Sequence, residues 1–314
     1  MAGYLVRRLL AALVTALLSS LAVFLLVRAV PGDIVAQMLG QAGGDPATEQ
    51  ALRGFFGLDR PVWQQYLAWL GQVLQGDLGT SWTQGLPVAG IVGQAFAVTL
   101  ELGLLTLIVA TAIGVPMGLV AGIHEGRLLD NVIQGINILG LAAPVFWIGL
   151  MLLIGASALI GWSPPFMYSP PGQDLWQNLQ ILLLPILSLG LLQAVAYSQF
   201  VRQSVVSALQ QDYVRTAIAK GLPQRKVFFK HILRNILIPL VTFMGLILVQ
   251  ILGGVVVIES LFALPGLGRL LLTSIQNRDL PVVQGGLLLV VGVALSLNIL
   301  IDTLYQYLDP RMRR

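Results

Sequence analysis

The chain has 314 residues, of which 56% are hydrophobic and only 10% are charged. A soluble globular domain usually carries about 25% charged residues, so composition excludes a fully water-soluble fold and part of the surface must face lipid. The net charge of +4 is not a nucleic-acid signal here, because in a membrane chain it first reports topology. The chain has no cysteine, which excludes disulfides, thiolate metal sites and thiol catalysis.

Six apolar segments are long enough to cross a bilayer, since a spanning helix needs about 20 mostly apolar residues. These segments are Leu9–Val27, Val98–Val120, Val132–Leu159, Leu179–Val201, Ile236–Ile258 and Val282–Tyr305. A signal peptide is the alternative for the first segment, but its apolar run exceeds the usual length of roughly 7–15 residues and no A-x-A site follows. The sequence therefore predicts an all-α integral membrane protein with six transmembrane helices.

The distribution of basic residues predicts the orientation of these six spans, which place both termini on one side. If that side is the cytoplasm, 13 of the 18 Lys and Arg residues lie inside and five lie outside. The five outside residues are Arg28, Arg53, Arg60, Arg269 and Arg278. Cytoplasmic loops carry the excess of Lys and Arg, so we expect a cytoplasmic N-terminus and a cytoplasmic C-terminus.

The first long loop divides the chain into three parts. Residues 1–28 form the N-terminal transmembrane helix, and residues 97–314 form a core with five transmembrane helices. Residues 29–96 lie outside and contain two helix-like stretches, Thr48–Phe56 and Pro61–Gln75, which predict a small helical external subdomain. Its tryptophans indicate either a membrane-interface belt or a docking surface for a partner, and both interpretations stay open. They are Trp63, Trp69 and Trp82.

The second long loop, residues 202–235, is predicted to lie inside. Its apolar residues recur at short intervals, which indicates short amphipathic helices broken at Gly221-Leu222-Pro223. Glycine suits the left-handed cap of a helix and proline can open the next one. A basic segment that contacts anionic lipid is one interpretation. The apolar period and the glycine break favour a second, a helix–turn–helix that docks into another protein.

This loop carries two ordered motifs. The first is Asp212-Tyr213-Val214-Arg215-Thr216-Ala217-Ile218-Ala219-Lys220-Gly221-Leu222, and the second is Lys230-His231-Ile232-Leu233-Arg234-Asn235-Ile236-Leu237-Ile238-Pro239. They resemble the cytoplasmic coupling loop of ABC importer permeases, and more narrowly the first-permease (B-type) subunit of the peptide/nickel transporter family. The wider permease signature has Glu-Ala-Ala before the glycine and a nearer proline. This chain lacks that Glu, and the proline that ends its second motif, Pro239, lies 18 residues past Gly221. Both departures are usual in the peptide branch.

Further motifs extend the resemblance over the whole chain. They are Gly57–Pro61, Gly76–Ser81, Thr99–Leu102, Pro144–Gly149, Glu259–Arg269, Arg278–Gly285 and Leu308–Arg311. The resemblance implies a type I ABC importer permease fold in the plasma (inner) membrane of a prokaryote. It also implies a pore subunit of an ATP-driven importer for di- or oligopeptides or related small solutes, which couples closure of partner ATPases to alternating access.

The resemblance also implies partners and the absence of chemistry in this chain. The expected partners are a second homologous permease, two ABC ATPase subunits, an extracytoplasmic substrate-binding protein, the lipid bilayer and a peptide-like substrate. No nucleic acid is expected. ATP and Mg are expected on the ATPase subunits, so the chain itself is not expected to be an enzyme or to hold a cofactor, a metal or a catalytic residue.

Three groups of candidate site residues follow. The coupling loop that contacts the ATPase is assigned to Asp212, Tyr213, Arg215, Ala217, Ala219, Lys220, Gly221 and Arg225. The return of this loop to the membrane is assigned to His231, Arg234, Asn235 and Pro239, with Pro239 in about the first turn of the fifth span. The candidate pore or gate residues are Gln193, Gln199, Asn137, Gln250 and Glu259. For the amides, hydrogen bonding between helices is the favoured interpretation.

Three other functions are weighed against the importer. An intramembrane protease is disfavoured because the histidines, His124 and His231, both fall in loops and H-E-x-x-H is incomplete at Leu128. An ATPase within this chain is excluded because no G-x-x-x-x-G-K-[ST] motif is present. A stand-alone secondary transporter remains the alternative, although it would need no coupling loop and its ion site would be expected near the membrane midplane.

Overall fold

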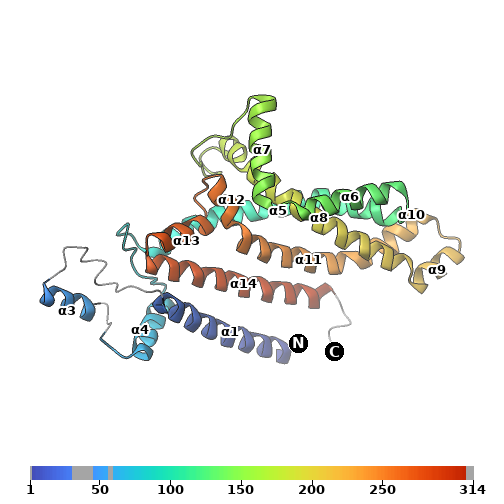
Figure 1. The fold of residues 1–314 in the computed structure, drawn as a ribbon. Helices are drawn as coiled ribbons and strands as arrows, with labels where there is room; N and C mark the ends of the chain where they lie inside the picture. The colour runs from blue at the N-terminus through green and yellow to red at the C-terminus, as the bar shows by residue number, and fades with distance from the viewer. Residues whose placement is uncertain (1, 30–44, 56–58, 309–314) are drawn as a thin grey trace. The chain divides into compact units, whose positions relative to one another are not determined.

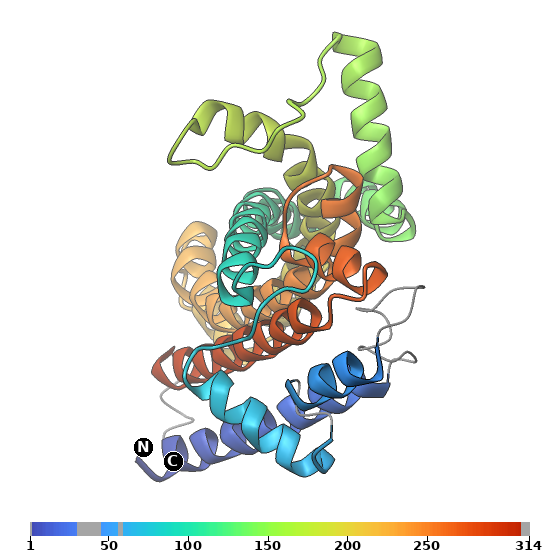
Figure 2. The same cartoon turned by 90° about the vertical axis from the view of Figure 1, so that its left-hand side faces the viewer.

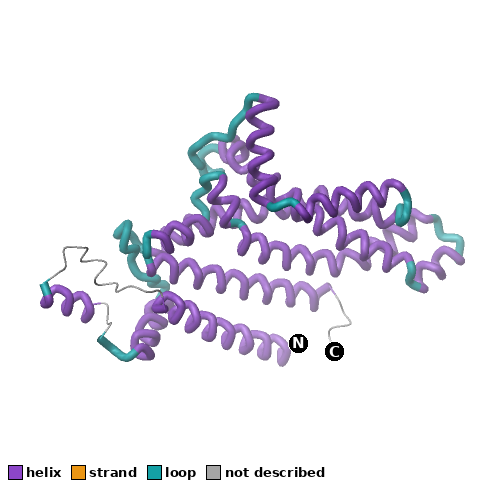
Figure 3. Tube along the Cα trace, in the orientation of Figure 1, coloured by secondary structure: helices purple, strands orange, loops and turns teal. Residues whose placement is uncertain are grey.

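The computed structural model describes residues 2–29, 45–55 and 59–308. Every regular element in these ranges is a helix (Figure 3). In the same ranges, Thr80 and Pro87 form an isolated β-bridge. The predicted all-α fold is confirmed. The motifs at Gly57–Pro61 and Leu308–Arg311, and the C-terminal arginines, lie partly or wholly outside the described residues.

The long apolar helices match the predicted spans (Figure 1). Four single helices are long and apolar enough to cross a membrane: α1 (Ala2–Ala29), α5 (Val88–Ile123), α8 (Leu175–Leu209) and α14 (Leu280–Leu308). The other elements are α3 (Pro46–Phe55), α4 (Val62–Leu74), α6 (Leu128–Ala142), α7 (Val145–Ile160), α9 (Asp212–Ala219), α10 (Gln224–Lys226), the π-helix η1 (Val227–Ile232), α11 (Leu233–Gly254), α12 (Val256–Leu261) and α13 (Leu267–Gln276). The two predicted external helices are present as α3 and α4.

The third predicted span is not one continuous helix. α6 and α7 are apolar enough to form a span together, but they are bent by 102° at the break between them (Figure 2). Ala143 is extended, with φ −83° and ψ 127°, and Pro144 directly precedes α7. A residue before proline is pushed out of the helical region. The prediction of an uninterrupted helix over Val132–Leu159 is wrong because it ignored Pro144.

Two other predicted spans begin or end at residues that differ from the helix ends in the structure. α8 continues to Leu209, so Arg202 lies inside a helix and does not open a loop. The fifth span is divided into α11, which ends at Gly254, and the short α12. The apolar stretch of α11, Asn235–Ile251, is shorter than the other spans.

The chain forms two compact units. One comprises Met1–Gln94 with Leu271–Leu295, and the other comprises Ala95–Leu270 with Ser296–Arg314. The long helices α5 and α14 each contribute residues to both units. The two units are described separately below.

In the first unit, aromatic side chains pack α4 against α1. The Phe24 ring of α1 lies 5.4 Å from the Tyr66 ring and 5.6 Å from the Trp69 ring, centroid to centroid. The hydroxyl oxygens of Ser20 and Tyr66 are 2.8 Å apart. Trp69 is therefore used for helix packing, whereas Trp63 is 62% exposed. The three tryptophans considered for a single belt thus have different surroundings.

Also in the first unit, Asp279 holds the loop before α5. Its buried carboxylate accepts hydrogen bonds from the Ser81 hydroxyl at 2.5 Å, the Thr83 hydroxyl at 2.6 Å, and the backbone N–H groups of Trp82 and Thr83, both at 3.2 Å. Burial raises the pKa of the Asp279 carboxyl, but these hydrogen bonds outweigh burial and lower the pKa below its ordinary value of 3.8. The ionised carboxylate therefore stabilises this corner of the fold.

This lowered pKa predicts an acid-dependent loss of stability. A carboxyl whose pKa is lower in the folded than in the unfolded chain stabilises the fold above the unfolded pKa, and the contribution is lost as pH falls through the folded pKa. At neutral pH we expect Asp279→Asn to unfold at a lower temperature than wild type in detergent, with the difference closing below about pH 4. The exposed Asp77→Asn serves as control. A difference that stays constant from neutral pH to the acid limit of the titration would contradict the assignment.

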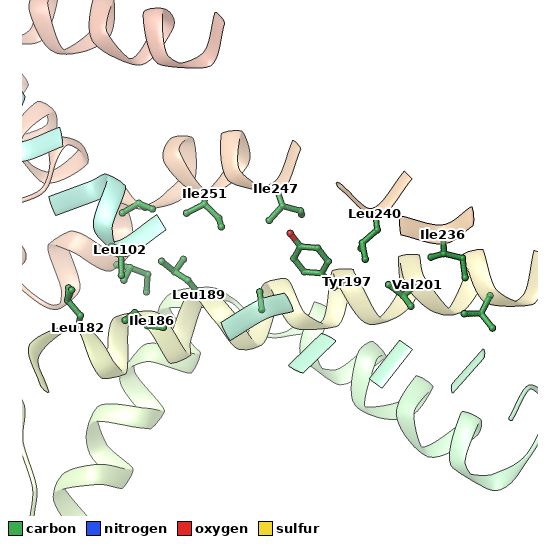
Figure 4. Packing of buried hydrophobic residues seen from close by; sticks show 14 of the residues in the cluster. Leu102, Leu182, Ile186, Leu189, Tyr197, Val201, Ile236, Leu240, Ile247 and Ile251 are labelled. Atoms are coloured by element: carbon green, nitrogen blue, oxygen red, sulfur yellow. The ribbon is translucent and has the colours of Figure 1, made fainter. Parts of the chain in front are cut away.

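The second unit is built around α8, most of whose central residues are buried. Tyr197 is fully buried and packs edge-on against Phe243 of α11 at 5.4 Å, while Phe200 stacks on the same ring at 4.3 Å. Ile236 and Ile251, from the two halves of α11, lie over opposite ends of this stretch of α8 (Figure 4). α11 therefore runs antiparallel to α8 along an apolar seam.

Three glycines on one side of α5 allow it to approach α8 closely. Gly114, Gly118 and Gly122 follow the i, i+4, i+8 spacing of a small-residue ridge, which is common where membrane helices pack. A Cβ added at Gly118 would lie 2.5 Å from the carbonyl oxygen of Ser198, and one at Gly122 would lie 2.6 Å from Cβ of Val205. The order of these contacts shows that α5 runs parallel to α8. Sequence analysis missed this ridge, although its spacing is a local signal.

Gly118→Ala is therefore expected to destabilise the second unit by about 1–3 kcal/mol, because the added methyl meets α8 backbone that can move only with the whole helix. Thermal unfolding in detergent measures the change. Gly135→Ala on α6 is the matched control, since no atom lies within 4 Å of its added Cβ. Alanine is the better helix former, so the control should be neutral or slightly stabilising. Equal unfolding temperatures for both variants would contradict the close packing.

Candidate functional site

The predicted break in the cytoplasmic loop is present. α9 ends at Ala219, and Gly221 adopts a left-handed conformation with φ +74°. The N–H of Lys226 donates to the carbonyl of Pro223 at 2.8 Å, which forms the turn that opens α10. The local prediction of a helix, a glycine cap and a proline-started helix is confirmed.

α9 is fixed to its own chain along one side. Val214 is fully buried and Ala217 is 6% exposed, and both belong to the same apolar core as Val205 of α8 and Val227 of η1. Ala217, predicted to allow close approach of an ATPase, thus faces the permease interior instead. Ala219, two residues later, is exposed.

The opposite side of α9 is open. We call it the α9 face, and its exposed residues are Asp212, Tyr213, Arg215, Thr216, Ile218, Ala219 and Lys220. Arg215 lies 3.8 Å from Asp212, in a solvent-exposed pair. Such a pair contributes little to stability, so these charges remain available to a partner. Tyr and Arg are also the residue types enriched in the energetic centres of protein interfaces.

The residues assigned to the return of the loop have different positions. Asn235 is exposed, as is the coupling-loop residue Arg225 on α10. Pro239 is half-buried and lies inside α11, not in the first turn of a helix, because α11 begins at Leu233 and continues directly from η1. The side chains of His231 and Arg234 lie outside the described part of the structure.

Among the candidate pore residues, the amides differ in burial. Asn137 on α6 is fully buried and donates from Nδ2 to the Ser198 hydroxyl of α8 at 3.1 Å, which matches the favoured interhelical interpretation. Gln193 is also buried, Gln199 is half-buried and Gln250 is exposed. Of these four amide side chains, Gln250 is therefore the most exposed.

An ion pair that sequence analysis missed fixes α6 to the far end of α8. Arg202 donates to both carboxylate oxygens of Asp130, at 2.6 and 2.7 Å, and the N–H of Gly126 donates to the same carboxylate at 2.9 Å. Bidentate pairing of this kind is strong and directional. It lies two turns before the end of α8, so it holds the helix that leads directly into α9.

Glu259 forms the second polar centre of this unit. Its carboxylate is fully buried and accepts from the Thr99 hydroxyl at 2.5 Å and from the backbone N–H of Arg269 at 2.9 Å. The Thr99 oxygen in turn accepts from the N–H of Leu267 at 2.8 Å. We call Glu259, Thr99, Gly266, Leu267, Gly268 and Arg269 the Glu259 cluster.

The Glu259 cluster is packed without spare space. A Cβ added at Gly266 would overlap the Glu259 carboxylate, and one added at Gly268 would lie 2.6 Å from Cγ2 of Val256. The carboxylate therefore joins α5, α12 and the start of α13, and it is buried from solvent in this structure. The cluster and α9 lie at opposite ends of α11, whose 22 residues span about 33 Å.

The chain was compared with known families. A model described as "Binding-protein-dependent transport system inner membrane component" matches residues 114–314, and the corresponding N-terminal model matches residues 1–105. The chain belongs to this family of ABC importer permeases. The permease is thus a transport subunit, and ATP hydrolysis takes place on a separate subunit.

Individual relatives agree with this assignment. The dipeptide transport system permease protein DppB of Escherichia coli K12 is 35% identical over 336 residues, covering 100% of this chain and 99% of that protein. The glutathione transport system permease protein GsiC of Escherichia coli O6:H1 is 36% identical over 313 residues, with the same coverage.

Solved structures show the same fold. An amino acid ABC transporter crystallised with histidines matches with a TM-score of 0.57 at 12% identity, covering 69% of this chain and 94% of that chain. The MetNI methionine ABC transporter matches with a TM-score of 0.52 at 16% identity, covering 70% and 96%. The type I importer permease fold is thus confirmed, and the permease is a multi-pass protein of the inner membrane.

Proposed function

We propose that this permease is the first-permease subunit of an importer for di- or oligopeptides or related small solutes. DppB and GsiC, named for dipeptide and glutathione transport, both match it from end to end. Glutathione is itself a peptide, so both relatives are named for the transport of peptides. A second homologous permease completes the pore, and an extracytoplasmic binding protein delivers the substrate.

The α9 face is the surface that receives the ATPase. The observation that carries this assignment is the two-sided structure of α9: Val214 and Ala217 are packed in the core while Tyr213, Arg215 and Lys220 stay exposed. η1 packs against α8, α9 and α11. A displacement of α9 by closing ATPases is therefore passed to two spans at once. ATP and Mg remain on the ATPase subunits.

The helix directions support the alternation of spans on which the proposed orientation is built. α5 runs parallel to α8, and α11 runs antiparallel to it, as alternating spans require. With both termini inside, α9 and most of the basic residues fall on the cytoplasmic side. Since the chain has no cysteine, single cysteines report sidedness cleanly. We expect an impermeant maleimide to label Trp63→Cys but not Arg215→Cys in intact cells; the reverse pattern would overturn the orientation.

Reconstitution tests the function directly. The permease is purified with its co-encoded neighbours, placed in liposomes, and assayed for ATP hydrolysis with the binding protein and a panel of dipeptides, longer peptides and free amino acids. We expect peptides to stimulate hydrolysis and to accumulate in the lumen, with free amino acids inactive. Stimulation by free amino acids alone would overturn the peptide assignment, and transport without any ATPase would restore the secondary-transporter alternative.

A further inference from the structure

Two polar contacts hold α6 along the last turns of α8 (Figure 1). Asp130, in the first turn of α6, pairs with Arg202 of α8. Further along α6, the Asn137 amide donates to the hydroxyl of Ser198, which lies one turn earlier in α8, at 3.1 Å. α6 therefore runs antiparallel to α8, and the ion pair is the one of these two contacts that lies nearer to α9.

The Asp130–Arg202 pair also closes the turn between α5 and α6. The side chain of Asp130 is 2% exposed and that of Arg202 is 26% exposed. The same carboxylate accepts from the N–H of Gly126, which adopts a left-handed conformation with φ +73°. On α5, a Cβ added at Gly122 would lie 3.1 Å from the carbonyl oxygen of Arg202. The end of α5, the start of α6 and one turn of α8 are thus joined at this pair.

The same end of α8 is tightly connected to α9. Two residues, Gln210 and Gln211, separate the two helices. The N–H of Gln211 donates to the carbonyl of Ala208 at 3.2 Å. Val205 of α8 and Val214 of α9 are fully buried and belong to one apolar core. A displacement of α9 therefore moves the end of α8 with it.

We propose that Asp130 and Arg202 are positioning residues of the importer, which make α6 move together with α8 when the ATPases displace α9. Apolar contact is non-directional and tolerates small sliding of one helix along another. A guanidinium that meets a carboxylate through two parallel hydrogen bonds has one favoured geometry. The pair lies about 10 Å before the end of α8, so a displacement from α9 reaches it before the rest of that helix.

The pair adds a third span, α6, to the two spans that η1 contacts. α6 leads to the 102° bend before α7, and α7 packs against α8 and α12. The displacement is therefore carried from the α9 end of the unit toward the helices that surround the Glu259 cluster. This consequence rests on the proposed function of the α9 face, whereas the lock between α6 and α8 does not.

Stability alone does not require this ion pair. Replacing both members of a buried pair by uncharged side chains of similar size is often neutral or stabilising, because the two charges no longer have to leave water. Removing one member is costly, since the other charge stays buried without a partner. The informative change is therefore Asp130→Asn combined with Arg202→Met, the neutral double variant. Asn keeps an acceptor for the N–H of Gly126, and Met keeps an unbranched chain.

The first test measures the distance between α6 and α8 in the complex with the ATPase subunits, and it needs no transported substrate. Spin labels are placed on Val132→Cys of α6 and Gln203→Cys of α8, which are both exposed positions in a chain without cysteine. Dipolar electron paramagnetic resonance compares the complex without and with ATP. We expect one narrow distance distribution that ATP leaves unchanged. In the neutral double variant the distribution should broaden when ATP is added. A wild-type distance that changes with ATP, or an equally narrow distribution in the variant, would overturn the proposal.

The second test measures peptide transported per ATP hydrolysed in liposomes. We expect the neutral double variant to unfold near the wild-type temperature and to hydrolyse ATP, but to transport about fivefold less peptide per ATP. Arg202→Lys keeps the charge and loses the two-bond geometry, so its ratio should fall between the two. It also carries both measurements if the double variant unfolds.

The matched control is Arg127→Gln, which removes an exposed cation from the same turn and leaves the pair intact. It should match wild type in distance distribution and in transport per ATP. If wild type itself shows no peptide-stimulated hydrolysis, the proposed function fails, and the distance measurement still decides whether the pair locks α6 to α8. If wild type is coupled and the double variant has the same ratio, the positioning role is overturned.

Discussion

Replacing Tyr213 and Arg215 on the α9 face with alanine is expected to uncouple the importer. Both side chains are exposed in the permease, and removing central Tyr and Arg residues from an interface typically weakens binding by roughly 30-fold or more. The double variant should therefore lose co-purifying ATPase and lose hydrolysis stimulated by the binding protein. Its unfolding temperature should stay near that of wild type, because Val214 and Ala217 still fix α9 to the core.

The control for this experiment lies on α8, the helix that precedes α9, at the end far from α9. Trp176 is 71% exposed near the start of α8, about 50 Å along the helix from Leu209. Trp176→Ala removes a larger aromatic side chain, yet ATPase co-purification should not change. If the α9 double variant still retained its ATPase subunits at wild-type levels, α9 would not be their contact surface. If both variants lost them, the effect would reflect general instability.

The orientation of α9 also changes which substitutions are informative. A bulky charged residue at Ala217 would enter the permease's own core, so its effect on transport would report folding as well as coupling. Ala219 is exposed and is the cleaner position for a steric probe. In the sequence, the apolar residues Val214 and Ala217 lie three apart, which is the spacing that marks the buried side of a short helix.

The features of the fold that could be predicted were those with local causes. The α9 break follows from Gly221 and Pro223, whose backbone preferences act within a few residues. The external helices and the four long spans follow from apolar runs and their ends. The bend between α6 and α7 also has a local cause in Pro144, and it was missed because hydropathy alone was used to draw that span.

The polar contacts that hold the fold could not be predicted in this way. Arg202 and Asp130 are 72 residues apart, Thr99 and Glu259 are 160 apart, and Ser81 and Asp279 are 198 apart. A single sequence shows that each of these groups is polar, and it places all of them except Ser81 near the end of a predicted span. It does not show helix rotations, and rotation decides whether a carboxylate meets a donor, lipid or the pore. Glu259 was therefore predicted as a gate from its type and place alone.

A double-mutant cycle on the Glu259 cluster separates a buried structural role from a gate. Glu259→Ala should destabilise the permease by about 2–4 kcal/mol, because the Thr99 hydroxyl and the N–H of Arg269 lose their acceptor. Gly266→Ala should also destabilise it, since the added methyl overlaps the carboxylate. Denaturant unfolding in detergent measures both changes.

The double variant is the informative one. Glu259→Ala empties the space that the Gly266→Ala methyl needs, so the two losses should not add, and we expect a coupling energy of about 1 kcal/mol or more. Gly172→Ala, whose added Cβ meets no atom within 4 Å, is the control and should combine additively with Glu259→Ala. A gate residue with no structural role would give the opposite pattern: unchanged stability in Glu259→Ala with raised ATP hydrolysis in the absence of substrate. Additive losses at Glu259 and Gly266 would show that the carboxylate does not occupy the position described.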